Sequence, residues 1–137
     1  MQAWQFECVI PGAPIGKGRP RAAKMGSHVR LYTPKRTADW ERSSALIMRN
    51  EWRSAPLDKI CRVNIVAVFP RPKRLLRKKD PEHRLWHSSK PDIDTVCKSV
   101  LDSMVMAGVI RDDTQVVLLS AKSVYASKTE GPCVEVR

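Results

Sequence analysis

Short stretches of alternating or β-branched residues along the chain predict strands. Residues 4–10 alternate between apolar and polar side chains, and residues 62–69 (RVNIVAVF) are rich in β-branched ones. Both stretches run into prolines, which end strands because they lack a backbone donor. Weaker versions of the pattern predict further strands at 29–32, 115–126 and 133–136.

Two longer stretches instead repeat their apolar residues at helical spacing. We predict a first helix from Pro34 to about Arg53, with Thr33 as its cap and Pro34 in its first turn. A second helix is predicted over 92–107, and Gly108 follows it as a stop signal. The residues expected on the buried faces are Trp40, Ser44, Ile47, Met48 and Trp52 in the first helix, and Cys97, Val100, Leu101, Met104 and Val105 in the second.

The order of these elements, β-β-α-β-α-β-β, indicates the fold class. A chain of 137 residues is long enough for one domain with one core, and it leaves no room for a second. We therefore predict a single α/β domain over residues 1–137, built as a mixed β-sheet covered by two main helices.

The chain is strongly basic, with 25 Lys and Arg against 14 Asp and Glu and a formal charge of +11. Nucleic acid is the leading partner, because cationic side chains release the counterions condensed on phosphates. RNA is favoured by charge alone, since the chain has no aromatic ribonucleoprotein motif. A membrane surface competes less well: no apolar run approaches the roughly 20 residues of a span, and the N-terminus lacks a basic leader region. We therefore expect a soluble, cytoplasmic protein.

Cysteine and glycine patterns exclude two other classes of site. The four cysteines form no C-x-x-C pair and are expected to be reduced and packed as small apolar residues. The segment GAPIGKGRPR lacks the spacing of a Walker loop, so we expect no nucleotide cofactor. The cysteines are Cys8, Cys61, Cys97 and Cys133.

Two histidines flank a tryptophan in the polar region before the second helix. His83 and His87 are spaced like ligands on one helix face, but the glutamate of the H-E-x-x-H pattern is missing. A metal role for them is therefore not favoured. Trp86, between them, either stacks on a base or fills a space in the core.

Basic residues gather in two segments. Lys17, Arg19 and Arg21 alternate, so an extended loop would place them on one side as a phosphate-binding row; a plain solvated loop is the alternative. Residues 71–90 are typical of a long surface loop, and its tract RPKRLLRKK is a DNA-contacting arm, a localisation-like patch or a solvated charge run. The DNA-binding candidates are Lys17, Arg19, Arg21, Arg71, Lys73, Arg74, Arg77, Lys78, Lys79 and Lys90.

Five acids gather in the segment KPDIDTVCKSVLDSMVMAGVIRDDTQV, within a chain that is otherwise basic. Asp92 and Asp94 stand two apart at the start of the predicted helix, where both can converge on a divalent cation. Mg²⁺ prefers carboxylate and water oxygens, and it assists phosphodiester cleavage. The alternative is structural: Asp92 caps the helix and Asp94 complements its positive end.

A structural and a functional interpretation are also both open for Lys98 and for the pair Asp112 and Asp113. Lys98 follows Asp94 by one helical turn, so it either forms an ordinary ion pair with Asp94 or stabilises negative charge on a phosphate. Asp112 and Asp113 occupy a turn, where one aspartate commonly caps backbone N–H groups. The second aspartate needs another explanation.

Together these residues resemble the RusA family of Holliday junction resolvases. The family pattern is a P-D-x-D-N segment, a lysine four residues on, and a G-x-x-x-D-D turn, and PGAPIGKGRPR followed by Y-T-P resembles the opening of its phage-type members. Thr95 stands where the family has asparagine, which replaces two amide donors by one hydroxyl. The matching residues are Pro91, Asp92, Asp94, Lys98, Gly108, Asp112 and Asp113.

The resemblance implies a metal-dependent endodeoxyribonuclease that resolves four-way DNA junctions by symmetric paired nicks in bacterial or phage recombination and repair. It further implies a homodimer with paired active sites, Mg²⁺ (or Mn²⁺) as cofactor, and Lys98 as the catalytic lysine. A catalytically inactive DNA-binding module with the same basic loops is the alternative, which Thr95 keeps open. The implied metal ligands are Asp92, Asp94 and Asp113, and the implied supporting residues are Asp112 and Thr95.

Asp113 stands far along the chain from Asp94. A helix from Asp94 to Ala107 rises roughly 20 Å, and residues 108–113 span about 20 Å only when they are extended. The two acids therefore meet only if the helix is shorter than predicted, if the connection is unusually direct, or if a second subunit supplies Asp113.

Overall fold

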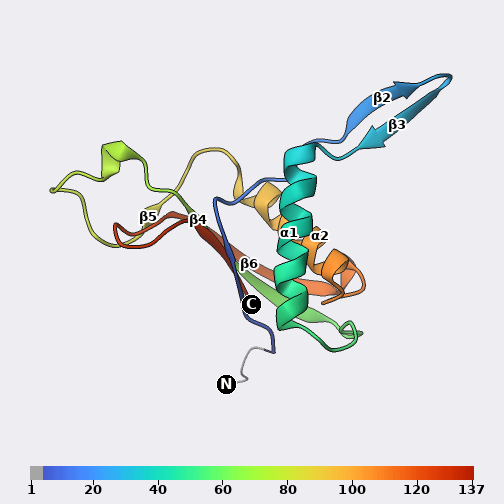
Figure 1. The fold of residues 1–137 in the computed structure, drawn as a ribbon. Helices are drawn as coiled ribbons and strands as arrows, with labels where there is room; N and C mark the ends of the chain where they lie inside the picture. The colour runs from blue at the N-terminus through green and yellow to red at the C-terminus, as the bar shows by residue number, and fades with distance from the viewer. Residues whose placement is uncertain (1–4) are drawn as a thin grey trace.

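The computed structural model describes residues 5–137, which form a small α/β domain (Figure 1). Five strands make a sheet in the order β1-β7-β4-β6-β5, in which β4 and β6 run parallel and the other neighbours are antiparallel. The predicted mixed sheet with two main helices is confirmed. The strands are β1 (Cys8–Pro11), β4 (Cys61–Phe69), β5 (Leu85–Trp86), β6 (Val116–Tyr125) and β7 (Cys133–Val136).

Both helices, α1 (Lys35–Glu51) and α2 (Ile93–Ala107), lie side by side over one face of the sheet (Figure 1). Parallel strands need a crossover connection, and α2 belongs to the one that joins β4 to β6. Val63 of β4 packs with Met48 of α1 and Val100 of α2 in the main core. The opposite face of the sheet holds only a small buried cluster of Val66, Val68, Val124 and Ala126.

α2 begins and ends close to the predicted residues. Asp92 is its N-cap, and Gly108 takes the C-cap with a φ of 75°, a left-handed conformation that glycine adopts at little cost. The predicted apolar stripe is wrong at Val105, which is exposed because it lies away from α1 and the sheet. Ser99 and Ser103 are fully buried instead, and the Ser103 hydroxyl donates to the Ser99 carbonyl.

α1 ends at Glu51, two residues before the predicted end. Pro34 occupies the capping position in place of the first turn, and no side chain caps the helix. Ser44 and Met48 are buried as predicted, whereas Trp40, Ile47 and Trp52 are only partly buried. The remaining buried residues of α1 are Thr37, Glu41 and Ala45.

A two-stranded hairpin begins at Arg21, within the segment expected to be an extended basic loop around Lys17, Arg19 and Arg21. Strand β2 (Arg21–Met25) pairs with β3 (His28–Tyr32), and only the second of these was predicted, as 29–32. The hairpin projects from the body of the domain (Figure 1), and nearly all of its residues are exposed. Because it buries no face, β2 carries no hydrophobic alternation from which a strand could be predicted.

The segment 71–90, predicted as a long loop, contains a 3₁₀ turn (η1, Lys73–Leu75) and the short strand β5. Leu85 and Trp86 pair with the end of β6, and two residues are too few to show a period. The strand predicted over 4–10 is observed as β1, which begins only at Cys8 and ends at Pro11; Trp4 lies outside the described residues.

All four cysteines are free, in agreement with the sequence. Burial, with a smaller contribution from the nearby Glu51 carboxylate, raises the pKa of the Cys8 thiol to about 11, so it stays protonated at neutral pH. Within residues 5–137, no helix combines the length and the hydropathy needed to cross a membrane.

Candidate functional site

The two acids at the start of α2 are not used to cap it. Asp92 occupies the N-cap position, but its side chain accepts no hydrogen bond from the helix; its Oδ2 pairs with Lys90 Nζ at 2.9 Å. Asp94 is exposed in the first turn, and among the described residues no donor or basic group binds its carboxylate. The capping interpretation is therefore wrong for the Asp92 side chain, and both carboxylates face solvent.

Asp112 is the structural aspartate of the pair in the turn. It caps the 3₁₀ turn η2 (Asp113–Gln115), where its Oδ1 accepts from the Thr114 N–H at 2.9 Å. This backbone N–H holds the pKa of Asp112 below its usual range. Gln115 completes the capping box: its Oε1 accepts from the Asp112 N–H at 3.0 Å, and its amide donates to the Leu57 carbonyl at 2.7 Å. The turn is thereby fixed, which leaves Asp113 free to act elsewhere.

Asp113 comes back to α2 within one chain. Val109 and Ile110 are buried directly after the helix, and Ile110 forms a bridge with Leu57 that sends the chain straight back. Asp113 Oδ2 then lies 3.2 Å from Lys98 Nζ. The return is direct, but it places Asp113 beside Lys98, one helical turn beyond Asp94, so the two acids do not meet within this chain and the three alternatives stay open.

Lys98 stands between two carboxylates. Its ammonium lies 3.2 Å from Asp113 Oδ2 and 3.3 Å from Asp102 Oδ1, and the predicted pair with Asp94 is not formed. Asp113 first, and Asp102 second, raise the pKa of Lys98 by binding its charged form. The side chain is half exposed, so a cation is available at the surface at neutral pH.

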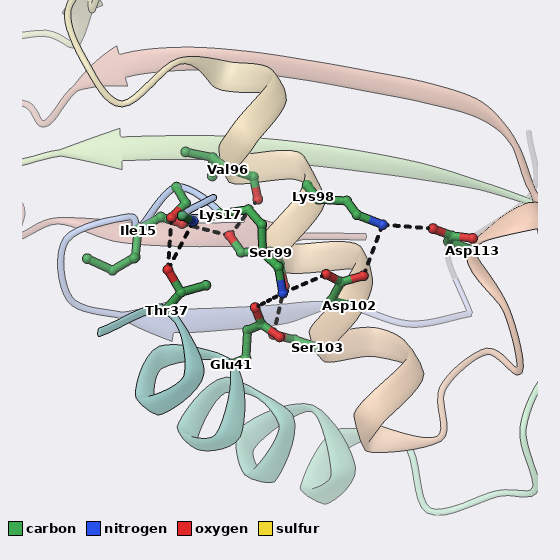
Figure 2. A network of polar contacts seen from close by, with 12 residues as sticks. Ile15, Lys17, Thr37, Glu41, Val96, Lys98, Ser99, Asp102, Ser103 and Asp113 are labelled. Atoms are coloured by element: carbon green, nitrogen blue, oxygen red, sulfur yellow. Dashed lines mark hydrogen bonds and ion pairs between the residues drawn. The ribbon is translucent and has the colours of Figure 1, made fainter. Parts of the chain in front are cut away.

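Lys17 does not belong to the predicted row of phosphate-binding side chains. Its ammonium points inward, 2.7 Å from Glu41 Oε1 and 3.0 Å from Asp102 Oδ2 (Figure 2). Arg19 and Arg21 remain exposed, and all three residues line one cleft, but the Lys17 ammonium is held by the two carboxylates. The prediction is wrong for the Lys17 ammonium because Glu41, an acid on the buried face of α1, needs a counterion.

Glu41 and Asp102 were not among the residues predicted to be functional. Glu41 is only 5% exposed, and it lies three residues before Ser44 and seven before Met48, both predicted to be buried. An acidic residue spaced to face the core with Ser44 and Met48 was the sequence signal for a buried charge. Asp102 gave none, since an acid four residues after Lys98 is an ordinary surface pair.

A cleft of about 790 Å³ opens beside the start of α2. Its basic lining residues are Lys17, Arg19, Arg21, Arg36 and Lys90, and Asp92 and Thr95 also line it. Arg36, in the first turn of α1, was not predicted, because a lysine–arginine pair on an exposed turn is common. The cleft offers phosphate-sized space with cations on its walls and a carboxylate at its edge.

Thr95 contributes to packing at this cleft. Its Oγ1 donates to the Asp92 carbonyl at 2.8 Å. A Cβ added to Gly16 would lie only 2.5 Å from the same oxygen, so Thr95 and Gly16 are in close contact. Thr95 thus holds the backbone beneath Asp92, while the segment around Gly16 covers it.

The carboxylates of this corner suit a hard cation in their chemistry. Asp92, Asp94 and Asp113 offer oxygen donors at the surface, where water can complete a coordination shell. Within residues 5–137, however, no three His, Cys, Asp or Glu side chains lie close enough together to hold a metal ion. The ammonium of Lys98 holds Asp113 instead. The predicted three-acid metal site stays a prediction.

In the basic tract of 71–79, two arginines contact other groups of this chain and the remaining basic residues are exposed. Arg71 is partly buried, with its Nη1 donating to the His83 carbonyl, and Arg77 pairs with Asp80 at 3.2 Å. Four other basic residues are exposed, and no acidic partner binds them within the described part of the chain. They are Lys73, Arg74, Lys78 and Lys79.

The histidines and the tryptophan separate in space. His87 stacks on Phe69 with ring centroids 3.8 Å apart, and its Nδ1 lies 2.7 Å from Ser123 Oγ. His83 instead contacts the Arg84 carbonyl, so the two histidines do not share a ligand. Trp86 is 76% exposed, which excludes the core and leaves the indole face open.

A small α/β domain with surface carboxylates, a fixed lysine and a basic cleft has the features of an enzyme that acts on nucleic-acid phosphodiesters. The family model described as Endodeoxyribonuclease RusA matches residues 11–137, and the chain belongs to this family. It is also similar to the Crossover junction endodeoxyribonuclease RusA of Aquifex aeolicus (strain VF5), with 23% identity over 137 residues that cover 97% of this chain and 91% of that protein. The resemblance read from the sequence is confirmed, and membership supports a nuclease.

Proposed function

We propose that this protein is a metal-dependent endodeoxyribonuclease that resolves Holliday junctions by paired, symmetric nicks. The observation that carries the proposal is the placement of Lys98 and Asp113 together, one turn along α2 from Asp94 and beside the basic cleft. Family membership and the name of the Aquifex aeolicus relative support the substrate class.

In this proposal the residues around α2 divide the work. Asp92, Asp94 and Asp113 would hold Mg²⁺, which would supply charge neutralisation on the phosphate and a more acidic water. Lys98 stabilises the negative charge that develops on the phosphate oxygens. Lys98 Nζ also lies 3.2 Å from Asp113 Oδ2, so it holds one of these carboxylates in place before the cation arrives.

The DNA-binding surface of the proposal extends from the cleft along the β2–β3 hairpin. Arg21 and Arg30 lie on one face of the hairpin, on alternate positions of paired strands. Strands of five residues reach roughly 17 Å, so the hairpin can follow phosphates or enter a major groove, which admits a two-stranded ribbon. Lys73, Arg74, Lys78 and Lys79 add cations beside β5, and exposed Trp86 offers a surface on which an unpaired base can stack.

A homodimer would complete the symmetry of the reaction. Among residues 5–137, nothing pairs with the outer edge of β6 from Val116 to Lys122, because β5 pairs with residues 124–125 and His87 bonds to Ser123. Leu118 on this edge is 58% exposed, and its neighbours Val117 and Leu119 are also exposed. An exposed apolar edge strand is prone to pair with another copy. A two-fold dimer formed there would present two sites to a junction of matching symmetry.

The competing function is a DNA-binding module without cleavage. The absence of a three-acid cluster from residues 5–137 favours it. Thr95, in place of an amide, points the same way.

The deciding experiment is cleavage of a labelled four-way junction in Mg²⁺, in Mn²⁺ and in EDTA, with a linear duplex of the same sequence as control. The proposal expects metal-dependent paired nicks in the junction alone, and loss of those nicks in Asp94→Asn with unchanged junction affinity and circular dichroism. Binding without cleavage in either metal would establish the inactive module. Wild-type cleavage by Asp94→Asn would refute its assigned role.

A further inference from the structure

Five charged side chains of alternating sign form one continuous chain of contacts between the helices (Figure 2). The chain starts at Glu41, which is buried on α1, and ends at half-exposed Asp113 in the turn. Burying charges is costly unless each has a partner, so a chain that leads from the core to the surface calls for a reason. In order, its members are Glu41, Lys17, Asp102, Lys98 and Asp113.

We propose that Lys17 and Asp102 are positioning residues for Lys98, with Glu41 as their buried anchor. Lys17 binds Oδ2 of Asp102, and this leaves Oδ1 of the same carboxylate to hold the Lys98 ammonium beside Asp113. The inference rests on the proposed nuclease function, since cleavage is what requires Lys98 at a defined point.

The backbone around Lys17 is fixed to both helices, which keeps its ammonium inside. The Lys17 N–H donates to the Thr95 carbonyl at 2.8 Å, and the Ser99 hydroxyl donates to the Ile15 carbonyl at 2.6 Å. On the other side, the Gly18 N–H donates to Thr37 Oγ1 at 3.1 Å. Residues 15–18 therefore act as a clasp, and Lys17 can reach a phosphate only if these bonds break.

Lys98 needs such support because a lysine is flexible and sits on a half-exposed helix face. Its side chain loses considerable rotamer freedom when it is fixed, and a catalytic group that is misplaced by about 1 Å loses roughly 100-fold in rate. Asp102 limits this freedom from the helical turn that follows Lys98, and Lys17 keeps Asp102 itself from turning toward solvent.

The test compares two variants that break the chain without leaving a charge buried alone. Asp102→Asn removes the negative charge that attracts the Lys98 ammonium, and the double variant Lys17→Met with Glu41→Met replaces the buried pair by apolar side chains. Lys59→Met, at an exposed site, is the control for losing a lysine that lies outside this chain of contacts. We expect single-turnover cleavage of a saturating four-way junction to fall about 10- to 100-fold in both test variants. Junction affinity in EDTA should stay within about threefold, because no phosphate contact is lost.

A second readout separates this inference from the proposed function. Relaxation of the side-chain ¹⁵N of Lys98 reports its order without any reaction, and Lys59 serves as the mobile reference. We expect Lys98 to be more ordered than Lys59 in the wild type and as mobile as Lys59 in both test variants. If the wild type cuts no junction, the nuclease proposal fails while relaxation still decides the positioning role.

Two results would overturn the inference. One is a double variant that cleaves at the wild-type rate but binds the junction at least tenfold more weakly, since Lys17 would then be a phosphate contact. The other is a wild-type Lys98 as mobile as Lys59. Thermal unfolding of each variant ensures that rates are compared at equal folded fractions.

Discussion

Gly16 lies in the clasp (residues 15–18), where the clasp crosses the start of α2. Replacing Gly16 by alanine should loosen the packing of the clasp against this helix. The added Cβ would stand 2.5 Å from Thr95 Oγ1 and 2.8 Å from Pro91 Cβ. Both distances are roughly 1 Å short of ordinary van der Waals contact, so the clasp must move. Overpacking of this kind costs about 1–3 kcal/mol of unfolding free energy.

Urea denaturation followed by circular dichroism measures this loss for Gly16→Ala. Gly131→Ala is the matched control, because nothing lies within 4 Å of its added Cβ and its φ is not positive; it should be neutral or stabilising by about 0.4–1 kcal/mol. Adding Thr95→Ala removes the nearer of the two clashes, so the double variant should lose less than the sum of the single ones. Equal stability of Gly16→Ala and Gly131→Ala would refute the close packing of the clasp.

Three further outcomes follow from other parts of the molecule. Replacing Arg21 and Arg30 by alanine should lower the slope of log affinity against log salt for a duplex arm by about 0.9 for each lost phosphate contact; an unchanged slope would place the hairpin away from DNA. Arg84 holds the pKa of Glu130 below its usual value near 4.3, so this stabilisation is present above that pH and lost as the pH falls through the lowered value; Glu130→Gln should flatten the acid side of a stability curve from urea titrations. Leu118→Lys should yield monomers in sedimentation if the β6 edge forms the dimer, and an unchanged sedimentation coefficient would exclude that edge.

The elements predicted correctly are those whose own residues carry a strong pattern. β4 was evident from its β-branched residues, and α2 from its apolar period and the glycine that ends it. β2 was missed because a hairpin exposed on both faces has no apolar positions to alternate. β5 was missed because its two residues are defined only by their partner strand.

The candidate site was predictable in its residue types but not in its contacts. The spacing of Asp92, Asp94, Lys98 and Asp113 marked these residues as a group, yet it could not show that Asp113 returns to Lys98 rather than to Asp94. That contact depends on Ile110 meeting Leu57, more than fifty residues earlier in the chain. Likewise, Lys17 resembled its neighbours Arg19 and Arg21, because only tertiary packing brings buried Glu41 to it.

The residues of the projecting hairpin are separate from those that stabilise the fold, whereas most small domains must bind and fold with the same residues. None of its side chains belongs to either buried cluster, so stability rests on the sheet and helices alone. The sequence and length of the hairpin can therefore change without loss of stability in the rest of the domain. We expect that replacing residues 21–32, between Pro20 and Thr33, by hairpins from other chains changes which DNA shapes are bound while the melting temperature stays the same.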